Sequence, residues 1–149
     1  MRMERRTRRG WLLLGGGVLI AIIGAGAAVH HAWDDLDESM CGNELLHENV
    51  SPDGKMKVVV FQRDCGATTG FSTQASIIPA GDALPKKSGD VFVADTGHGA
   101  APVGEGGGPE LRVQWLSNER VVLSHHVAAR VFKADAKHDE VDVVFELFR

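Results

Sequence analysis

The feature that most restricts this fold is an uncharged stretch near the amino terminus, WLLLGGGVLIAIIGAGAAV, residues 11–29. Its nineteen residues match the roughly 20 that a helix needs to cross the hydrocarbon core of a bilayer. A helix of a soluble domain would keep a polar face toward water, and this stretch has none. Trp11 and Trp33 lie near its two ends, where aromatic rings favour the membrane interface. We therefore predict a transmembrane helix over residues 11–29, with the lipid bilayer as its partner.

The charges on either side of this stretch predict its orientation. Five arginines precede Gly10, whereas the chain after residue 33 has 11 lysines and arginines against 19 acids. Basic flanks stay in the cytoplasm, so residues 1–10 are predicted to be a cytoplasmic tail and the rest to be exported. Cleavage as a signal peptide is the alternative, since residues 25–27 read Ala-Gly-Ala. The apolar stretch exceeds a typical signal core of about 7–15 residues, which favours a retained single-pass anchor.

The exported part divides into a stalk and one domain. Residues 30–50 begin with crowded acids, Asp34, Asp35, Asp37 and Glu38, which do not have the spacing of an EF-hand calcium loop. We interpret residues 30–50 as a solvated acidic stalk and residues 51–149 as an extracytoplasmic β-domain, a length that suits a single domain. The acidic balance outside the membrane excludes nucleic acid as a partner.

Apolar alternation predicts about six strands after the SPDGK turn at residues 51–55. KMKVVVFQR is apolar on both faces in its middle, which indicates a central strand, and SNER at residues 117–120 is typical of a hairpin turn. The predicted strands cover residues 55–63, 71–79, 91–95, 111–116, 120–127 and 140–148. The fold class is thus mainly β, a small antiparallel meander or sandwich preceded by the transmembrane helix. The glycine-rich segment 96–109 is expected to be a mobile loop.

The two cysteines, Cys41 and Cys65, predict a disulfide. They are the only cysteines in the chain, and an oxidising compartment outside the cytoplasm favours their pairing. Closing a loop of about 25 residues stabilises a fold by roughly 3 kcal/mol on the chain-entropy model.

The segment RDCGATTGFSTQ, residues 63–74, has two interpretations. As a binding loop it presents backbone amides and polar side chains to an anion or small polar ligand. The candidate ligand-binding residues are Arg63, Asp64, Thr68, Thr69, Ser72 and Thr73. As a structural turn, which the residue types favour, its hydroxyls bond the backbone, Asp64 pairs with an arginine, and Gly66 and Gly70 take positive φ.

Enzymatic chemistry is the weaker hypothesis. Asp95 begins an Asp-Thr-Gly sequence after an apolar strand, as in aspartic proteases, but such a dyad requires a second aspartate. Cys65 with a histidine base would make a thiol enzyme only if the disulfide does not form. The seven histidines show no metal-ligand spacing, so no metal and no cofactor is predicted.

The segment SPDGKMKVVVFQRDCGATTGFSTQASIIP, with CGNE before it and DVFVAD and VQWL after it, resembles a family of short, uncharacterised exported bacterial proteins that share a RDCGATTGFSTQ-type core. The resemblance covers roughly residues 41–127 and implies one bacterial module in which Cys41 and Cys65 belong together. It implies no substrate. We expect a protein of the bacterial inner membrane whose periplasmic or extracellular domain binds an envelope protein or a small polar ligand, or supports the envelope, through residues 63–74 and 96–109.

Overall fold

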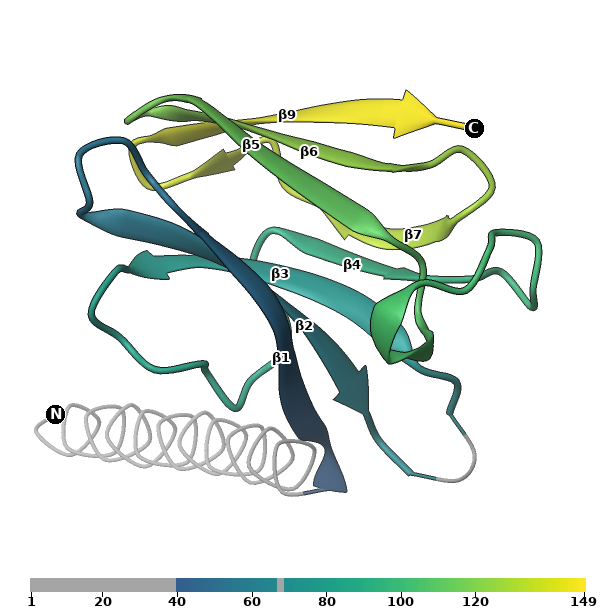
Figure 1. Cartoon of the computed structure of the whole chain (residues 1–149). Helices are drawn as coiled ribbons and strands as arrows, with labels where there is room; N and C mark the ends of the chain where they lie inside the picture. The colour runs from purple at the N-terminus through teal and green to yellow at the C-terminus, as the bar shows by residue number, and fades with distance from the viewer. Residues whose placement is uncertain (1–39, 67–68) are drawn as a thin grey trace, which may run out of the picture. The chain divides into compact units, whose positions relative to one another are not determined.

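The computed structural model describes residues 40–66 and 69–149. These ranges form nine β-strands and one short 3-10 helix, which confirms the mainly β fold (Figure 1). The predicted transmembrane helix over residues 11–29 and the tail before it lie outside the described residues. Within the described ranges, no helix has the length and apolar character that crossing a membrane requires.

The first sheet contains five antiparallel strands in the order β1-β2-β3-β4-β7. Their bounds are Gly42–Val50, Met56–Asp64, Ser72–Pro79, Phe92–Asp95 and Arg130–Ala134. The turn between β1 and β2 forms as predicted, because Asp53 Oδ1 accepts hydrogen bonds from Ser51 Oγ at 2.8 Å and from the Lys55 amide at 3.2 Å. The middle of β2 is buried on both faces, as expected of a strand between two neighbours.

The second sheet has the order β5-β6-β9-β8 and is mixed. Its strands are Leu111–Ser117, Arg120–His126, Val141–Phe148 and Lys137–His138. The β5–β6 hairpin closes with Ser117 opposite Arg120, at the predicted turn. The pair β6–β9 is parallel, which corrects the expectation of a purely antiparallel fold. After β6 the chain crosses to the first sheet to form β7, so β9 returns beside β6 in the same direction.

Three of the strands were not predicted from the sequence. Residues 42–50, assigned there to the acidic stalk, form β1, and their prediction as stalk is wrong. This strand lies at the edge of its sheet and has a register shift between Leu45 and His47, which breaks the alternation. The strands β7 and β8 are short and mostly exposed, so neither has an apolar face that a pattern search detects.

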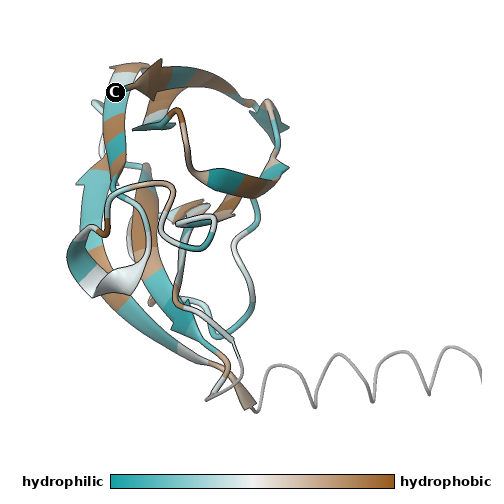
Figure 2. Ribbon diagram, turned by 90° about the vertical axis from the view of Figure 1, so that its right-hand side faces the viewer, coloured by the Kyte–Doolittle hydropathy of each residue, from teal (hydrophilic) through white to brown (hydrophobic). Residues whose placement is uncertain are grey.

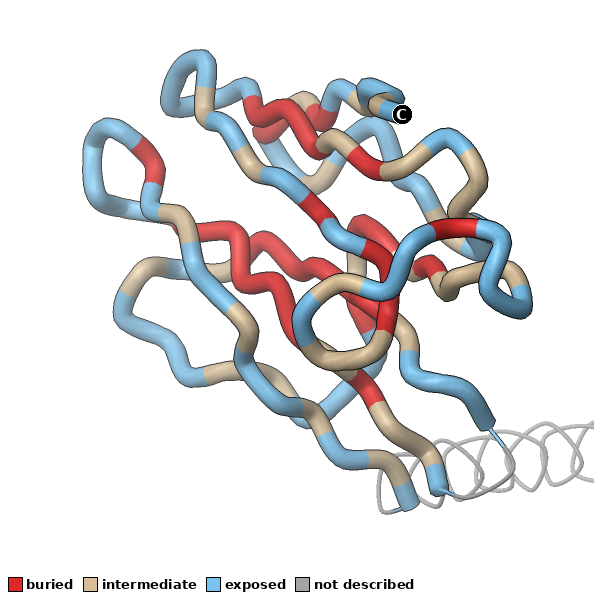
Figure 3. The backbone as a smooth tube through the Cα atoms, turned by 45° about the vertical axis from the view of Figure 1, so that its right-hand side comes forward, coloured by how far each residue is buried: buried red, intermediate tan, exposed pale blue. Residues whose placement is uncertain are grey.

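One hydrophobic core lies between the two sheets, visible in Figure 3 as buried segments of strands from both. Phe92 of β4 stacks on Phe145 of β9, with ring centroids 6.0 Å apart. Along several strands in Figure 2, hydrophobic and hydrophilic residues alternate, as expected where a sheet buries one face. The buried core residues are Val58, Val60, Ala75, Ile77, Val91, Phe92, Ala94, Leu111, Val121, Leu123, Val141 and Val143.

The two sheets also meet along the edge strands β1 and β5. The Trp115 Nε1–H donates a hydrogen bond to the Asn49 carbonyl at 2.9 Å, and Asn49 Nδ2 donates to the Val113 carbonyl at 3.4 Å. These bonds join the end of β1 to the end of β5. We call the boundary between these two strands the β1–β5 seam.

Candidate functional site

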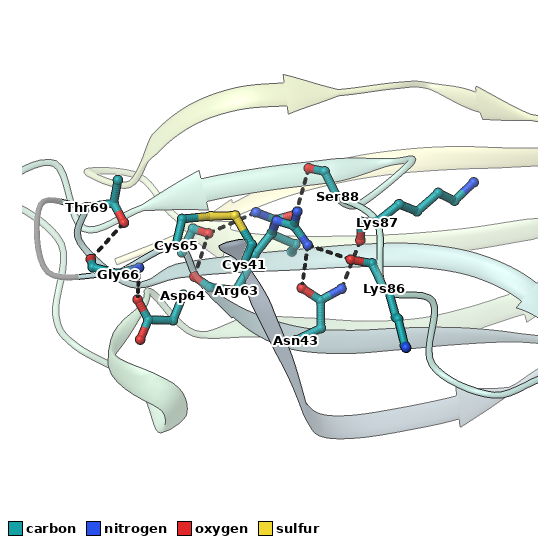
Figure 4. The surroundings of a disulfide bond; sticks show 12 residues. Cys41, Asn43, Arg63, Asp64, Cys65, Gly66, Thr69, Lys86, Lys87 and Ser88 are labelled. Carbon is teal, nitrogen blue, oxygen red and sulfur yellow. Dashed lines mark hydrogen bonds between the residues drawn. A yellow bond between two sulfur atoms is a disulfide. The ribbon is translucent and has the colours of Figure 1, made fainter. Parts of the chain in front are cut away.

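The disulfide prediction is confirmed, because Cys41 and Cys65 are bonded to each other (Figure 4). The bond stands next to the register pair Gly42–Asp64, where β1 begins and β2 ends. The disulfide therefore crosslinks β1 and β2 at one end of this strand pair. Since Cys65 is oxidised, it has no thiol that would act as a nucleophile.

Arg63 is 5% exposed and performs a structural task. Its Nη1 donates to Asn43 Oδ1 and to the Lys86 carbonyl, both at 2.8 Å (Figure 4). Asn43 Nδ2 in turn donates to the carbonyls of Pro85 and Lys87, at 2.7 and 2.9 Å. Arg63 and Asn43 thus hold the loop between β3 and β4 against the first strand pair.

The remaining candidate side chains of the 63–74 segment bond to backbone. Asp64 Oδ1 accepts from the Gly66 amide at 2.9 Å, an Asx turn that replaces the predicted arginine pair. Thr69 Oγ1 donates to the Gly66 carbonyl at 3.1 Å, and Ser72 Oγ donates to the Arg63 carbonyl at 3.3 Å. Thr68 lies outside the described residues. These contacts are local side-chain-to-backbone hydrogen bonds, which stabilise a turn.

Two further details of this segment concern Thr73 and its glycines. Thr73 is 1% exposed, and its hydroxyl donates to the Pro109 carbonyl at 2.7 Å. Gly66 has the predicted positive φ of 97°, whereas the prediction for Gly70 is wrong, since its φ lies outside the positive range. The Thr73 bond joins the segment to a part of the chain 36 residues away.

The glycine-rich segment 96–109 packs against the 63–74 segment, in place of the mobile loop expected. It contains the 3-10 helix η1, Glu105–Gly107. A Cβ added at Gly107 would stand 2.6 Å from Phe71 Cδ2, and one at Gly108 would stand 2.4 Å from Thr73 Oγ1. These glycines permit a backbone approach that no other residue allows. The two segments proposed as one contact surface are therefore in direct contact.

A cavity of about 300 Å³ opens beside this junction, at the β1–β5 seam. Its floor is buried and comprises Val60, Thr73, Pro109 and Leu111, with Leu46 forming a wall. The exposed rim consists of His47, Glu105, Glu110 and Arg112. Of all these residues, only Thr73 belongs to the candidate set from the sequence. The others were missed because the seam depends on β1, which the sequence pattern did not reveal.

The rim contains one closed ion pair. Arg112 Nε donates to Glu110 Oε1 at 2.8 Å, and Arg112 Nη2 donates to Glu110 Oε2 at 3.2 Å. The Arg112 bond holds the pKa of Glu110 below its ordinary value of 4.5. The guanidinium carbon also lies 3.9 Å from the ring centroid of Phe148. Because Glu110 and Arg112 neutralise each other, their net contribution to the charge of the rim is near zero.

Asp95 is held in a second ion pair. Arg130 Nε donates to Asp95 Oδ1 at 3.0 Å, Arg130 Nη2 contacts Oδ2, and the Gly97 amide donates to Oδ1 at 2.8 Å. The hydrogen bonds from Arg130, and then from Gly97, hold the pKa of Asp95 below its ordinary value of 3.8. Arg130 Nη1 also lies 3.1 Å from His98 Nε2. A proton-sharing dyad requires a second carboxylate beside the first, whereas the Asp95 oxygens bond to Arg130 and to the Gly97 amide.

No group of three or more metal-ligating side chains comes together among the described residues. A scan against protein-family models, a search of curated proteins and a search of solved structures find no match to this chain. The family resemblance of residues 41–127 therefore stays a prediction, and functional inference depends on the geometry alone.

Proposed function

We propose that this chain is a membrane-anchored binding module, held by residues 11–29 and acting outside the cytoplasm of a bacterium through its β-domain. One observation carries the proposal. The 63–74 and 96–109 segments, far apart in the sequence, pack together through Phe71–Gly107 and through Thr73–Pro109, and the second pair forms part of the floor of the seam cavity. Loops held on a rigid sheet are where binding residues usually lie.

One of the exposed side chains at this junction is the aromatic ring of Phe71. Phe71 is 46% exposed, and its ring lies so close to Gly107 that a Cβ added there would stand 2.6 Å from Phe71 Cδ2. Rigid aromatic side chains lose little conformational entropy on binding and recur as anchors of interfaces. Phe71 is therefore the residue on which we base the test.

The disulfide supports the location. Disulfides persist in oxidising compartments and are rare in the cytosol, and Cys41–Cys65 follows a stretch with the composition of a membrane anchor. A reporter that is active only after export is expected to be active when fused to the carboxyl terminus. Activity of a cytoplasmic reporter at that position would contradict the proposed location.

Binding is tested by crosslinking in intact cells, comparing the full chain with Phe71→Ser and Phe132→Ser. Phe132 is 61% exposed on β7, outside the two contacting segments, and is the matched control. We expect Phe71→Ser to lose the crosslinked partner at unchanged expression and Phe132→Ser to retain it. Equal retention by both variants would overturn the proposed surface.

The enzymatic alternative is a hydrolase that uses Asp95 or Cys65. The disulfide at Cys65 and the Arg130 pair at Asp95 both argue for structural roles. Both carboxylate oxygens of Asp95 bond to Arg130, whereas an aspartic dyad requires a second carboxylate that shares a proton with the first. Binding is therefore the better supported function.

A further inference from the structure

We infer that the seam cavity binds a large apolar side chain that lies next to a positive charge in a polypeptide partner. The inference rests on the proposed function and names the chemistry of its partner. It follows from the size of the cavity, the composition of its floor and the charge of its rim, taken in turn.

The size of the cavity limits its occupant. Ligand-binding cavities range from about 300 to 1,000 Å³, so the volume of about 300 Å³ lies at the lower end. A cavity of this size suits one large side chain rather than a whole cofactor. Protein interfaces commonly use such a pocket to bury one anchor residue of the partner.

The floor selects an apolar group. Val60 and Leu111 are buried hydrocarbon, and Thr73 already donates its hydroxyl to the Pro109 carbonyl. Every buried side-chain nitrogen or oxygen among the described residues has a hydrogen-bond partner, so the floor offers no unpaired buried side-chain polar atom. A polar group placed there would lose its hydration without compensation.

The rim selects a cation beside that group. Arg112 is neutralised by its bidentate bonds to Glu110. Glu105 is exposed and, within the described part of the chain, has no lysine or arginine within ion-pair distance. The rim therefore retains one uncompensated carboxylate. The sequence after residue 33 is also acidic, with 19 acids against 11 basic residues, which attracts basic partners over a longer range.

The test uses the full chain in lipid nanodiscs with isotopically labelled leucine and valine methyl groups. Three capped tetrapeptides serve as probes: Gly-Phe-Lys-Gly, Gly-Phe-Glu-Gly and Gly-Ser-Lys-Gly. Titrations are run at low ionic strength and pH 8, where histidine side chains are ordinarily neutral. The methyl resonances of Leu46, Val60 and Leu111 report directly on the cavity.

We expect the Phe-Lys peptide to shift these resonances and to bind about fivefold more tightly than the Phe-Glu peptide. The Ser-Lys peptide should leave them unmoved, because it has no group for the floor. Glu105→Gln should lower the preference for lysine over glutamate to about twofold or less. Glu119→Gln, an exposed acid in the β5–β6 turn, is the matched control and should keep the full preference.

Three outcomes would overturn the inference: unmoved cavity methyl resonances with the Phe-Lys peptide, equal affinity for the Phe-Lys and Phe-Glu peptides, or an undiminished preference in Glu105→Gln. Failure of the proposed function is a different observation, since it consists of crosslinks that survive Phe71→Ser. The peptide titration reads the cavity itself and needs no cellular partner, so the two failures are distinguishable.

Discussion

At the scale of residues, the hydroxyl groups of the 63–74 segment differ in how far along the chain their hydrogen-bond acceptors lie. Thr69 and Ser72 bond to nearby backbone, whereas Thr73 reaches the Pro109 carbonyl across 36 residues. A turn needs only the first kind of bond. The Thr73 bond instead couples two distant parts of the chain, and it is buried.

Thr73→Val is expected to lower the free energy of unfolding by about 1–2 kcal/mol, because the Pro109 carbonyl loses its donor while side-chain volume is kept. Urea denaturation followed by circular dichroism measures the change. Thr69→Val, at an exposed hydroxyl, is the control and should stay within about 0.5 kcal/mol. Comparable losses in both variants would show that burial of the bond has no importance.

The lowered pKa of Asp95 predicts that the stability of the fold decreases in acid. Its pKa is lowered in the folded state, so its ion pair with Arg130 stabilises the fold fully above the ordinary pKa of 3.8. That stability is lost as the pH falls through the lower, folded-state pKa. Urea midpoints measured between pH 6 and pH 2 should therefore fall less steeply for Asp95→Asn than for the unchanged chain below about pH 4. Parallel profiles would mean that Asp95 has the same pKa folded and unfolded.

At the scale of elements, the glycine-rich segment is ordered by contact rather than by hydrogen-bonded strand pairing. Gly104 donates from its amide to the Gly108 carbonyl at 2.7 Å, which closes a small ring of backbone around η1. Gly106 and Gly107, with φ of 76° and 82°, supply the left-handed turns that this ring requires. The composition that suggests mobility is here the composition that permits close packing.

Gly108→Ala is expected to destabilise the fold by about 1–3 kcal/mol, since the new methyl group would overlap Thr73 Oγ1 and displace the segment. Gly70→Ala is the matched control, because no atom lies within 4 Å of a Cβ at that position. Thermal or urea unfolding of both variants measures the difference. A tolerated Gly108→Ala would indicate that the two segments separate without cost.

The disulfide lies at the start of β1 and is expected to stabilise that strand. On the chain-entropy model, replacing both cysteines by serine should lower the free energy of unfolding by about 3 kcal/mol. Amide hydrogen exchange should show the largest loss of protection in Gly42–Val50, whose outer edge is unpaired along most of its length. Uniform loss of protection in β1 and in β6 would contradict this local effect.

At the scale of the whole molecule, the core joins two sheets, and the chain contributes strands to each sheet in two separate passes. The strand β9 pairs with β6 on one side and with β8 on the other, and it buries Val141 and Val143. The second sheet is therefore complete only when the last strand is present.

Deleting residues 141–149 is expected to abolish the cooperative unfolding transition, because it removes the partner of both β6 and β8. Circular dichroism during urea denaturation measures this. Deleting Arg149 alone, an exposed terminal residue, should leave the transition in place. A cooperative transition in the longer deletion would show that the first sheet folds by itself.

The sequence predicted those strands that bury one whole face or both. LRVQWL alternates between apolar and polar residues and KMKVVVFQR is apolar on both faces, and both form strands with the matching burial. The edge strands β1 and β7 bury too little to show a pattern, and Phe132 on β7 is among the most exposed large apolar side chains. Strand pairing across the chain, such as the parallel β6–β9 pair, leaves no local signature.

In the candidate site, too, local contacts could be expected from the sequence and long-range contacts could not. Bonds between near neighbours, such as the one from the Thr69 hydroxyl to the Gly66 carbonyl, follow from residue type and were expected in kind. The bond from Arg63 to Lys86 and the seam cavity require residues that only the fold brings together. Of the candidate residues from the sequence, only Thr73 lines the cavity, and none of the rim residues that give the cavity its charge was among them.

The position of the disulfide has a mechanical consequence. The chain enters the β-domain at Cys41, so tension transmitted from the preceding segment arrives at the free end of β1. Without a crosslink, such a pull would peel β1 from β2 one hydrogen bond at a time. The covalent bond to Cys65 passes the load to the end of β2, which is paired with β1 and β3 and buried in the core. Detachment would then require many bonds to break together.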